Sequence, residues 1–189
     1  MSDVLDLDGP NPWQTQSRHV VYDNGRLRLC EDRVIQPDGE PGTYTYLELA
    51  WPVVAIVPFS DDGYVHLVRQ WRYPWQSNSW EIPAGHCEPN ELPLDGARRE
   101  LAEEVSLEAA NWEPLGNGYS SASLNARYHL FLARELSPVK HEHPREGTER
   151  DLIARRVPLA EALAAAMDGR IAHGLSVVGV LRAARRLGW

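Results

Sequence analysis

The stretch that decides the fold covers residues 85–107 and reads GHCEPNELPLDGARRELAEEVSL. Its second half carries three glutamates, Glu100, Glu103 and Glu104, at positions i, i+3 and i+4. If residues 93–105 form a helix, these carboxylates project from neighbouring positions on one side of it. Like charges at this spacing repel by about a few tenths of a kcal/mol per pair. Because a hard divalent cation such as Mg²⁺ or Mn²⁺ offsets such repulsion, the sequence predicts a metal site on this helix.

The same segment has apolar side chains at helical spacing, at Leu94, Ala97, Leu101 and Val105. This pattern is typical of an amphipathic helix that buries one side. We therefore expect the apolar side to pack on a core and the carboxylates to be presented on the other side. The alternative is a charged helix face that is merely solvated. Such a face usually interleaves lysines with its glutamates, and this segment contains no lysine.

The segment resembles the Nudix box, in which a glycine, five residues, a glutamate, seven residues and then Arg-Glu-aliphatic-any-Glu-Glu-any-Gly-aliphatic form a loop, helix and loop. The matching positions are Gly85, Glu91, Arg99, Glu100, Leu101, Glu103, Glu104 and Leu107. The one departure is Ser106, which stands in place of the last glycine. We expect Ser106 to end the helix, at a cost of ~1 kcal/mol if it keeps the left-handed backbone of a glycine. The resemblance implies an α/β fold, a Nudix α/β/α sandwich with a mixed sheet.

Two stretches before and into the box, VRQWRYP at 68–74 and WEIPAG at 80–85, look like the pyrophosphatase subgroup that cleaves ADP-ribose and other nucleoside diphosphate sugars. The looser resemblance covers about residues 51–163. It implies Mg²⁺-dependent hydrolysis of a diphosphate bond, giving a nucleoside monophosphate and a sugar phosphate. One departure bears on the substrate: Ala122 stands where the subgroup usually has a proline. A less rigid loop there leaves another nucleotide sugar or a dinucleotide open as the substrate.

The resemblance also implies roles for single residues. The metal ligands carry over as Glu100, Glu103 and Glu104, with the backbone carbonyl of Ala84 as a further ligand. Glu91 carries over as the partner of an arginine, Arg99 here, and would hold the loop on the helix rather than bind the ion directly. The bound ions would neutralise the diphosphate and lower the pKa of a bound water.

In the subgroup the general base is a glutamate in the flexible loop after the core strands. The corresponding loop here, residues 137–150, is polar, and with the residue after it offers four acids, Glu142, Glu146, Glu149 and Asp151. We favour Glu149 as the catalytic base, because it directly precedes the expected last strand. Glu146 is the second candidate, and the box residue Glu103 is the third.

Three residues outside the box are candidates for substrate binding. Arg69 and Arg72 are suited to a phosphate group through charge-assisted, often bidentate hydrogen bonds. Glu81 is suited to accept a hydrogen bond from a base or a ribose. The alternative for all three is a set of salt bridges at the end of a strand.

Composition excludes several classes of protein. The chain has 189 residues, 43% of them hydrophobic and 24% charged, which is enough for one sizeable core. A net charge of −8 without a basic stretch argues against a nucleic-acid partner. The chain has no long apolar run and no signal-like start, so we expect a cytoplasmic protein without a membrane partner. Cys30 and Cys87 are too few for a disulfide framework or a zinc site.

Strand and turn patterns divide the chain into two parts, an N-terminal antiparallel β meander at 1–50 and a hydrolase domain at 51–189. We expect strands at 19–22, 27–35, 43–49, 53–59, 64–71, 80–83, 112–119, 128–134 and 152–157, and helices at 93–105, 159–167 and 175–187. A three-stranded meander cannot bury both faces alone, so we expect a homodimer that uses it. Two other readings remain open: a non-catalytic Nudix domain that senses a nucleotide, and a purely structural interaction protein.

Overall fold

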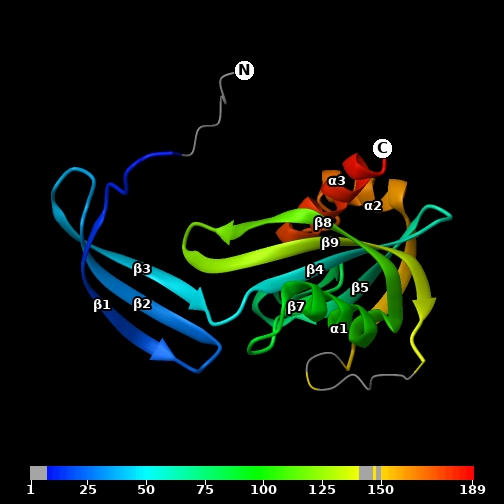
Figure 1. Cartoon of the computed structure of the whole chain (residues 1–189), viewed down its shortest axis with the longest axis horizontal. Coiled ribbons are helices and arrows are strands. Elements are labelled where there is room, and N and C mark those ends of the chain that lie inside the picture. The colour runs from blue at the N-terminus through cyan, green and yellow to red at the C-terminus, as the bar shows by residue number, and fades with distance from the viewer. Residues whose placement is uncertain (1–7, 141–146, 148–149) are drawn as a thin grey trace. The chain divides into compact units, whose positions relative to one another are not determined.

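Turn residues divide the N-terminal part of the chain into three strands. The computed structural model describes residues 8–140, 147 and 150–189. The strands are β1 (Gln14–Asp23), β2 (Leu27–Ile35) and β3 (Pro41–Leu49). They pair as an antiparallel meander, drawn in blue and cyan in Figure 1. The first turn is closed by Asn24, whose side chain accepts hydrogen bonds from two following backbone N–H groups. The predicted meander is confirmed, with β1 beginning earlier than expected.

The chain forms two compact units, and the meander belongs to the first. This unit comprises the chain up to Ala50 together with Ser121–Asn125. Within it Leu124 and Asn125 pair in parallel with the end of β3. The second unit comprises Trp51–Ser120 and Ala126–Trp189.

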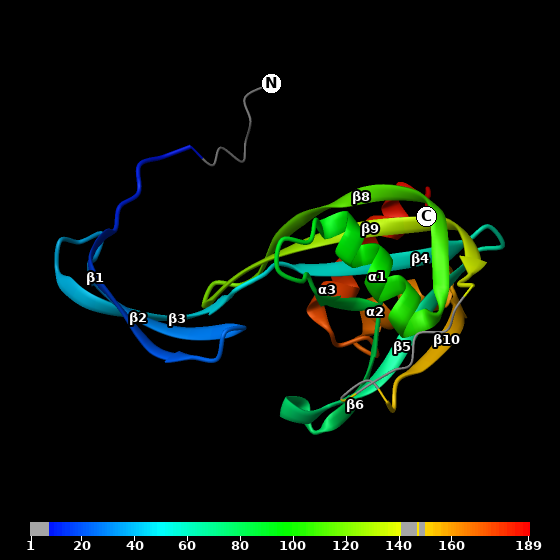
Figure 2. The ribbon, with the colours of Figure 1, turned by 60° about the horizontal axis from the view of Figure 1, so that its bottom comes forward.

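A mixed sheet forms the centre of the second unit. Its strands are β4 (Val53–Ser60), β5 (Tyr64–Arg72), β6 (Ser77–Glu81), β7 (Ala84–His86), β8 (Leu107–Ser121), β9 (Leu124–Pro138) and β10 (Ile153–Pro158), and a short 3-10 helix, η1 (Tyr73–Trp75), joins β5 to β6. Strand β4 runs parallel to β9 and antiparallel to β5 and β7. Strand β5 also pairs with β6 and β10. The β5–η1–β6 hairpin extends beyond the rest of the sheet as an arm (Figure 2).

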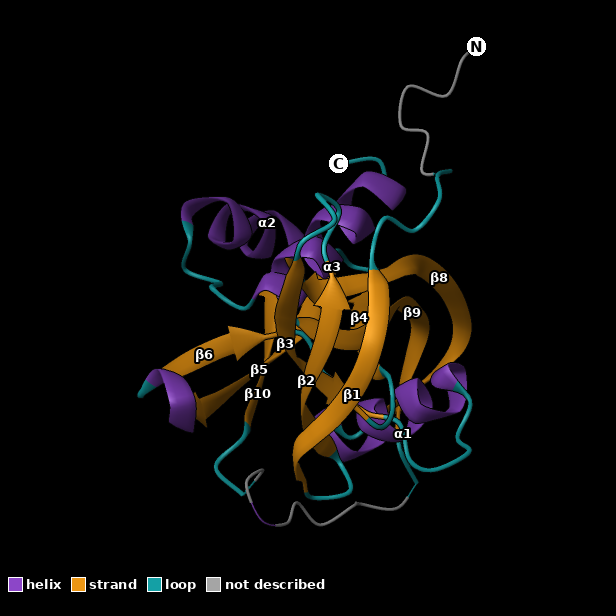
Figure 3. Cartoon of the chain, turned by 90° about the vertical axis from the view of Figure 1, so that its left-hand side faces the viewer, coloured by secondary structure: helices purple, strands orange, loops and turns teal. Residues whose placement is uncertain are grey.

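Three helices, α1 (Pro93–Val105), α2 (Leu159–Asp168) and α3 (Gly174–Arg186), cover the sheet. One core packs α2 and α3 on the sheet, with Leu130, Leu159 and Val180 at its centre. A second core packs α1 on the sheet through Leu101 and its neighbours. Helices α2 and α3 therefore lie on one side and α1 on the other (Figures 1 and 3). The expected α/β/α sandwich is confirmed.

Three strand predictions were wrong in their bounds. The strand expected at 80–83 is β6, which ends at Glu81. It ends there because the Ile82 N–H donates to Ser176 Oγ at 3.0 Å instead of to a strand, and Pro83 has no N–H. Strands β8 and β9 extend well beyond the expected 112–119 and 128–134. In the described part of the chain β8 pairs with β9 alone, and such an edge strand tolerates Pro114.

Two further features of the described residues are the lengths of the helices and the state of the cysteines. Within the described residues, no helix is both long enough and apolar enough to cross a bilayer. Cys30 and Cys87 are buried free thiols.

Candidate metal and diphosphate site

Helix α1 positions the glutamates, and local signals set both of its ends. Pro93 stands at the first turn, where its missing N–H costs nothing, and Asp95 complements the positive end of the helix dipole. The helix ends at Ser106, which takes left-handed backbone angles with φ 56° and ψ 38°. Its N–H still bonds to the Ala102 carbonyl at 3.1 Å. Serine therefore fills the position of the usual glycine cap, as expected.

Glu100 and Glu104 lie on the side of α1 that packs against strand β7, and both are buried. Their exposed fractions are 5% and 3%. Glu104 Oε2 accepts a hydrogen bond from the Ala84 N–H at 2.9 Å. The Glu100 carboxylate covers Gly85 so closely that a Cβ there would overlap it. A side chain at residue 85 would therefore force the Glu100 carboxylate to move.

Arg99 joins the loop before α1 to the acidic side of the helix. Its Nε and Nη2 each donate to the Glu91 carboxylate at 3.1 Å, and Nη2 also donates to the His86 carbonyl at 2.9 Å. Its Nη1 donates to Glu100 Oε1 at 2.8 Å and to Glu103 Oε2 at 3.0 Å. The hydrogen bonds with Glu91 raise the pKa of Arg99 and lower the pKa of Glu91. The pairing of Glu91 with Arg99 agrees with the role expected from the sequence.

The residues on α1 fit a divalent cation in their donor chemistry. In the part of the chain that the structure describes, no three His, Cys, Asp or Glu side chains enclose a common point. Yet Glu100 and Glu103 already converge on one positive charge, the Nη1 group of Arg99. Hard carboxylate and carbonyl oxygens are the ligands that Mg²⁺ and Mn²⁺ prefer. Glu100, Glu103, Glu104 and the carbonyl of Ala84 are therefore the groups that would hold the ion.

Arg72, the last residue of β5, and Glu81, the last residue of β6, form a bidentate ion pair. Arg72 Nε and Nη2 lie 2.8 and 2.6 Å from the two oxygens of Glu81. Glu81 is only 1% exposed, and its Oε2 also lies 2.9 Å from His173 Nδ1. Burial by itself would raise the pKa of Glu81, but the hydrogen bonds from Arg72 and His173 outweigh it and hold the pKa at about 2. Both oxygens of Glu81 thus have protein partners.

Arg69 lies apart from Arg72. The two residues are three positions apart on β5, so their side chains leave opposite faces of the strand. The Arg69 guanidinium stands 6.0 Å from the centre of the Trp80 ring, and that of Arg155 stands 5.2 Å from the same ring. Among the described residues, Arg69 Nε is buried without a hydrogen-bond partner. The structure therefore does not combine Arg69 and Arg72 into one clamp.

The candidates for the general base divide into two groups. Glu149 and Glu146 lie outside the described residues. Glu103 is described, and its side chain is 34% exposed beside Arg99.

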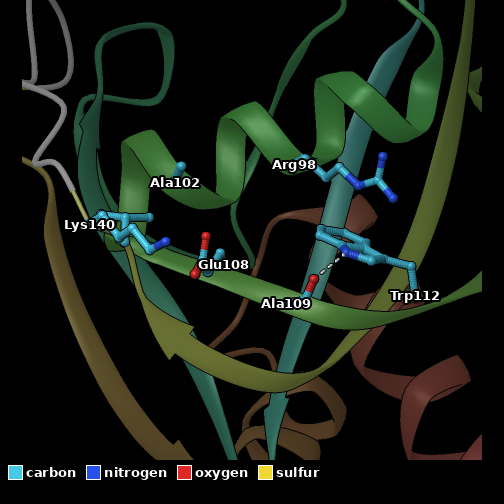
Figure 4. A pocket seen from close by; sticks show the side chains of 7 residues that line it. Arg98, Ala102, Glu108, Ala109, Trp112 and Lys140 are labelled. Carbon is cyan, nitrogen blue, oxygen red and sulfur yellow. Dashed lines mark hydrogen bonds between the residues drawn. The ribbon is translucent and has the colours of Figure 1, made fainter.

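A cavity of about 440 Å³ lies beside α1 (Figure 4). It is lined by Arg98, Ala102, Glu108, Ala109, Trp112, Val139 and Lys140. On α1, Arg98 and Ala102 point to the side opposite Glu100 and Glu104. Because none of the predicted site residues lines it, we give this cavity no part in the chemistry.

Sequence reasoning missed His173 and Ser176. Both lie at the start of α3, far along the chain from Glu81, and no spacing pattern links them to it. The one local signal is that His173 directly precedes an amphipathic segment. This signal does not identify Glu81 as the partner of His173.

Fold and site together define a class of proteins, the Nudix hydrolases. The NUDIX domain matches residues 50–175. The chain therefore belongs to the Nudix family, with the loop, helix and loop of the box at residues 85–107.

Curated relatives extend over most of the chain. The ADP-ribose pyrophosphatase of Mycobacterium tuberculosis (strain ATCC 25618 / H37Rv) is 31% identical over 175 residues, which cover 89% of this chain and 82% of that protein. The ADP-ribose pyrophosphatase of Bacillus subtilis (strain 168) is 36% identical over 152 residues, covering 79% and 80%. The methanol dehydrogenase activator of Bacillus methanolicus is 32% identical over 169 residues, covering 88% and 90%. The two ADP-ribose pyrophosphatases and the family match indicate that the chain is a hydrolase.

One solved structure, described as an ADP compounds hydrolase, superposes with a TM-score of 0.81. It covers 95% of this chain and 96% of its own at 19% identity. At that identity the likeness establishes the fold.

Proposed function

We propose that this protein is a Mg²⁺- or Mn²⁺-dependent hydrolase of a nucleoside diphosphate linked to another moiety. ADP-ribose or a related nucleotide sugar is the first substrate to test, and the products would be a nucleoside monophosphate and a sugar phosphate. The observation that carries the proposal is the convergence of Glu100 and Glu103 on one positive charge, next to the buried Glu104. The two ADP-ribose pyrophosphatases at 31% and 36% identity support the choice of substrate.

The residues of the site would divide the work. Glu100, Glu103, Glu104 and the Ala84 carbonyl hold the metal, which when bound neutralises the diphosphate and makes a coordinated water more acidic. Glu149 accepts a proton from the attacking water, with Glu146 and then Glu103 as the alternatives.

The arginines bind the substrate. Arg72 meets a phosphate, and we assign Glu81 to hold Arg72 because both of its oxygens are engaged by protein groups. Arg69 stays a candidate for a separate contact, on the other face of β5.

The N-terminal unit would serve dimerisation. Every residue of β1 is exposed within the chain, and Val20, Val21 and Tyr22 remain 43%, 51% and 55% exposed. Apolar side chains in such a strand favour burial against a second copy. We therefore propose a cytoplasmic homodimer acting on a small molecule, without nucleic-acid or membrane partners.

A second substrate class is favoured by one residue. Ala122 connects β8 to β9 where the subgroup usually has a proline, which keeps other dinucleotides in the comparison. A nucleotide-sensing domain without catalysis is the remaining alternative.

A substrate panel tests the proposal. The protein is incubated with ADP-ribose, ADP-glucose, GDP-mannose, NADH or diadenosine polyphosphates, each with Mg²⁺ or Mn²⁺, and the products are identified by chromatography. Metal-dependent release of a nucleoside monophosphate supports the proposal, provided that Glu100→Gln loses it under the same conditions. A wild type that hydrolyses none of these compounds contradicts it.

A further inference from the structure

We infer that His173 is a positioning residue that orients Arg72 through Glu81 for binding the diphosphate. This inference rests on the proposed function, because Arg72 is taken to meet a phosphate of the substrate. The inference adds a residue at the start of α3 that affects the affinity for the substrate.

Glu81 is the centre of the cluster. Its Oε1 accepts from Arg72 Nε at 2.8 Å, and its Oε2 lies 2.6 Å from Arg72 Nη2 and 2.9 Å from His173 Nδ1. A buried carboxylate is costly unless its lone pairs are satisfied. His173 therefore supplies one of the three contacts that hold Glu81 charged and in one orientation.

The same contact determines which ring nitrogen of His173 carries a proton. An ionised carboxylate oxygen only accepts hydrogen bonds, so Nδ1 must be protonated and donate to Glu81. Ser176 Oγ lies 2.8 Å from that same nitrogen and also accepts from the Ile82 N–H at 3.0 Å. Since Nδ1 is a donor here, it cannot take a proton from Ser176. His173 therefore holds the Glu81 carboxylate in place and does not form a serine–histidine nucleophile pair with Ser176.

Helix α3 gives the histidine a rigid base. His173 is the residue that caps α3, and its carbonyl accepts from the Val177 N–H at 3.0 Å. Seven and ten positions after His173, α3 packs into the core at Val180 and Ala183, which are fully buried. Side chains held on such an element keep their geometry better than side chains on loops.

The consequence reaches Arg72. A bidentate pair fixes the plane of a guanidinium, and that plane decides how it meets a phosphate. Without the His173 donor, Glu81 keeps Arg72 as its partner but loses the contact that stops its carboxylate from turning. Arg72, whose side chain is 34% exposed, would then sample several orientations. Such a loss weakens binding of substrate and transition state alike, which raises KM and leaves kcat unchanged.

The test compares His173→Ala with His173→Asn in the full chain. The asparagine amide N–H can replace the Nδ1 donor, whereas alanine cannot. We expect His173→Ala to raise KM about tenfold with kcat within about twofold, and His173→Asn to return KM to near the wild-type value. His66→Ala is the matched control, because His66 is also half-buried and also contacts a serine, Ser60, at 3.2 Å. An unchanged KM in His173→Ala, or a loss of thermal stability alone in both His173 variants, overturns the inference.

Equilibrium binding of ADP, measured by calorimetry without metal, separates this inference from the proposed function. If the wild type hydrolyses none of the compounds in the panel, the proposed function fails. The affinities of wild type and variants for ADP can still be compared in that case. About tenfold weaker binding in His173→Ala and near-normal binding in His173→Asn would support the positioning role on its own. Equal affinity in wild type and His173→Ala, or no binding to the wild type, overturns it.

Discussion

Glu104 accepts a hydrogen bond from the backbone N–H of Ala84 at 2.9 Å, which ties the acidic side of α1 to strand β7. The carboxylate is almost fully buried. Its position is therefore set by the strand as well as by the helix. Oε2 of Glu104 makes this structural hydrogen bond. A variant that removes the negative charge but keeps a hydrogen-bond acceptor therefore distinguishes a structural effect of Glu104 from a catalytic one.

Glu104→Gln should lower kcat by about a hundredfold or more while the protein stays folded, because the amide oxygen still accepts from Ala84 but the anionic metal ligand is gone. Steady-state kinetics at saturating Mg²⁺ and a thermal melt check this. Glu108→Gln, an exposed glutamate on β8, is the control and should change neither quantity. More than about a tenth of wild-type activity in Glu104→Gln would show that the metal assignment is wrong.

Glu81 makes stability depend on pH. Its pKa in the folded state is about 2, below its ordinary value of 4.5. A depressed pKa contributes stability that is complete above the ordinary value and is lost as pH falls toward the folded value. Wild type should therefore exceed Glu81→Gln in unfolding free energy at pH 7, by on the order of 3 kcal/mol, and the difference should shrink between about pH 5 and pH 2. Urea titrations across this range measure it, and a difference independent of pH would contradict the account.

The general base is tested in the loop after β9. Glu149→Gln should lower kcat about 10² to 10⁴-fold with little change in KM, as expected for the loss of general base catalysis. Glu146→Gln should then be nearly silent. Raising the pH should partly restore the Glu149 variant, because hydroxide can replace the missing proton acceptor.

Other outcomes of that pair of variants reassign the role. A silent Glu149→Gln with a strongly impaired Glu146→Gln would move the base to Glu146. Two silent variants would point to Glu103. No rescue at high pH would mean that the lost carboxylate held a metal ion.

The N-terminal meander is tested in the full chain. Val20→Glu combined with Tyr22→Glu places two charges on β1, one on each side of the bulge at Val21, where Val20 pairs with Cys30 and Tyr22 with Leu29. We expect wild type to be a homodimer and this double variant to dissociate, as measured by light scattering after gel filtration. Asp8→Asn, before the strand, serves as the control. Deletion of residues 1–50 should give an inactive, aggregating core. A well-behaved, active monomer after that deletion would refute the role of the meander.

Local signals explain why part of the site could be predicted. The helix at 93–105 follows from a proline at its start, a break at Ser106 and an apolar period between them, all of which lie within one segment of sequence. The pairing of Glu91 with Arg99 is likewise local to the box. The ordering of strands in the meander follows from turn residues placed between apolar runs.

Long-range packing explains what was missed. The burial of Glu100 and Glu104 depends on β7, which meets α1 only after the chain has folded back. The contact between Glu81 and His173 joins β6 to a helix near the end of the chain. Arg69 and Arg72 lie on opposite faces of β5 because side chains alternate along a strand. Their spacing in the sequence already implies this, but the sequence does not show which partners each face meets.

The central claim is that the α1 glutamates hold a metal ion that diphosphate hydrolysis requires. The most direct measurement follows ADP-ribose by ³¹P NMR with enzyme freed of metal by EDTA, before and after a titration with Mg²⁺ or Mn²⁺. The account predicts no cleavage without metal, and formation of AMP and ribose 5-phosphate once metal is added. Unchanged cleavage in EDTA, or no cleavage at any metal concentration, would contradict it.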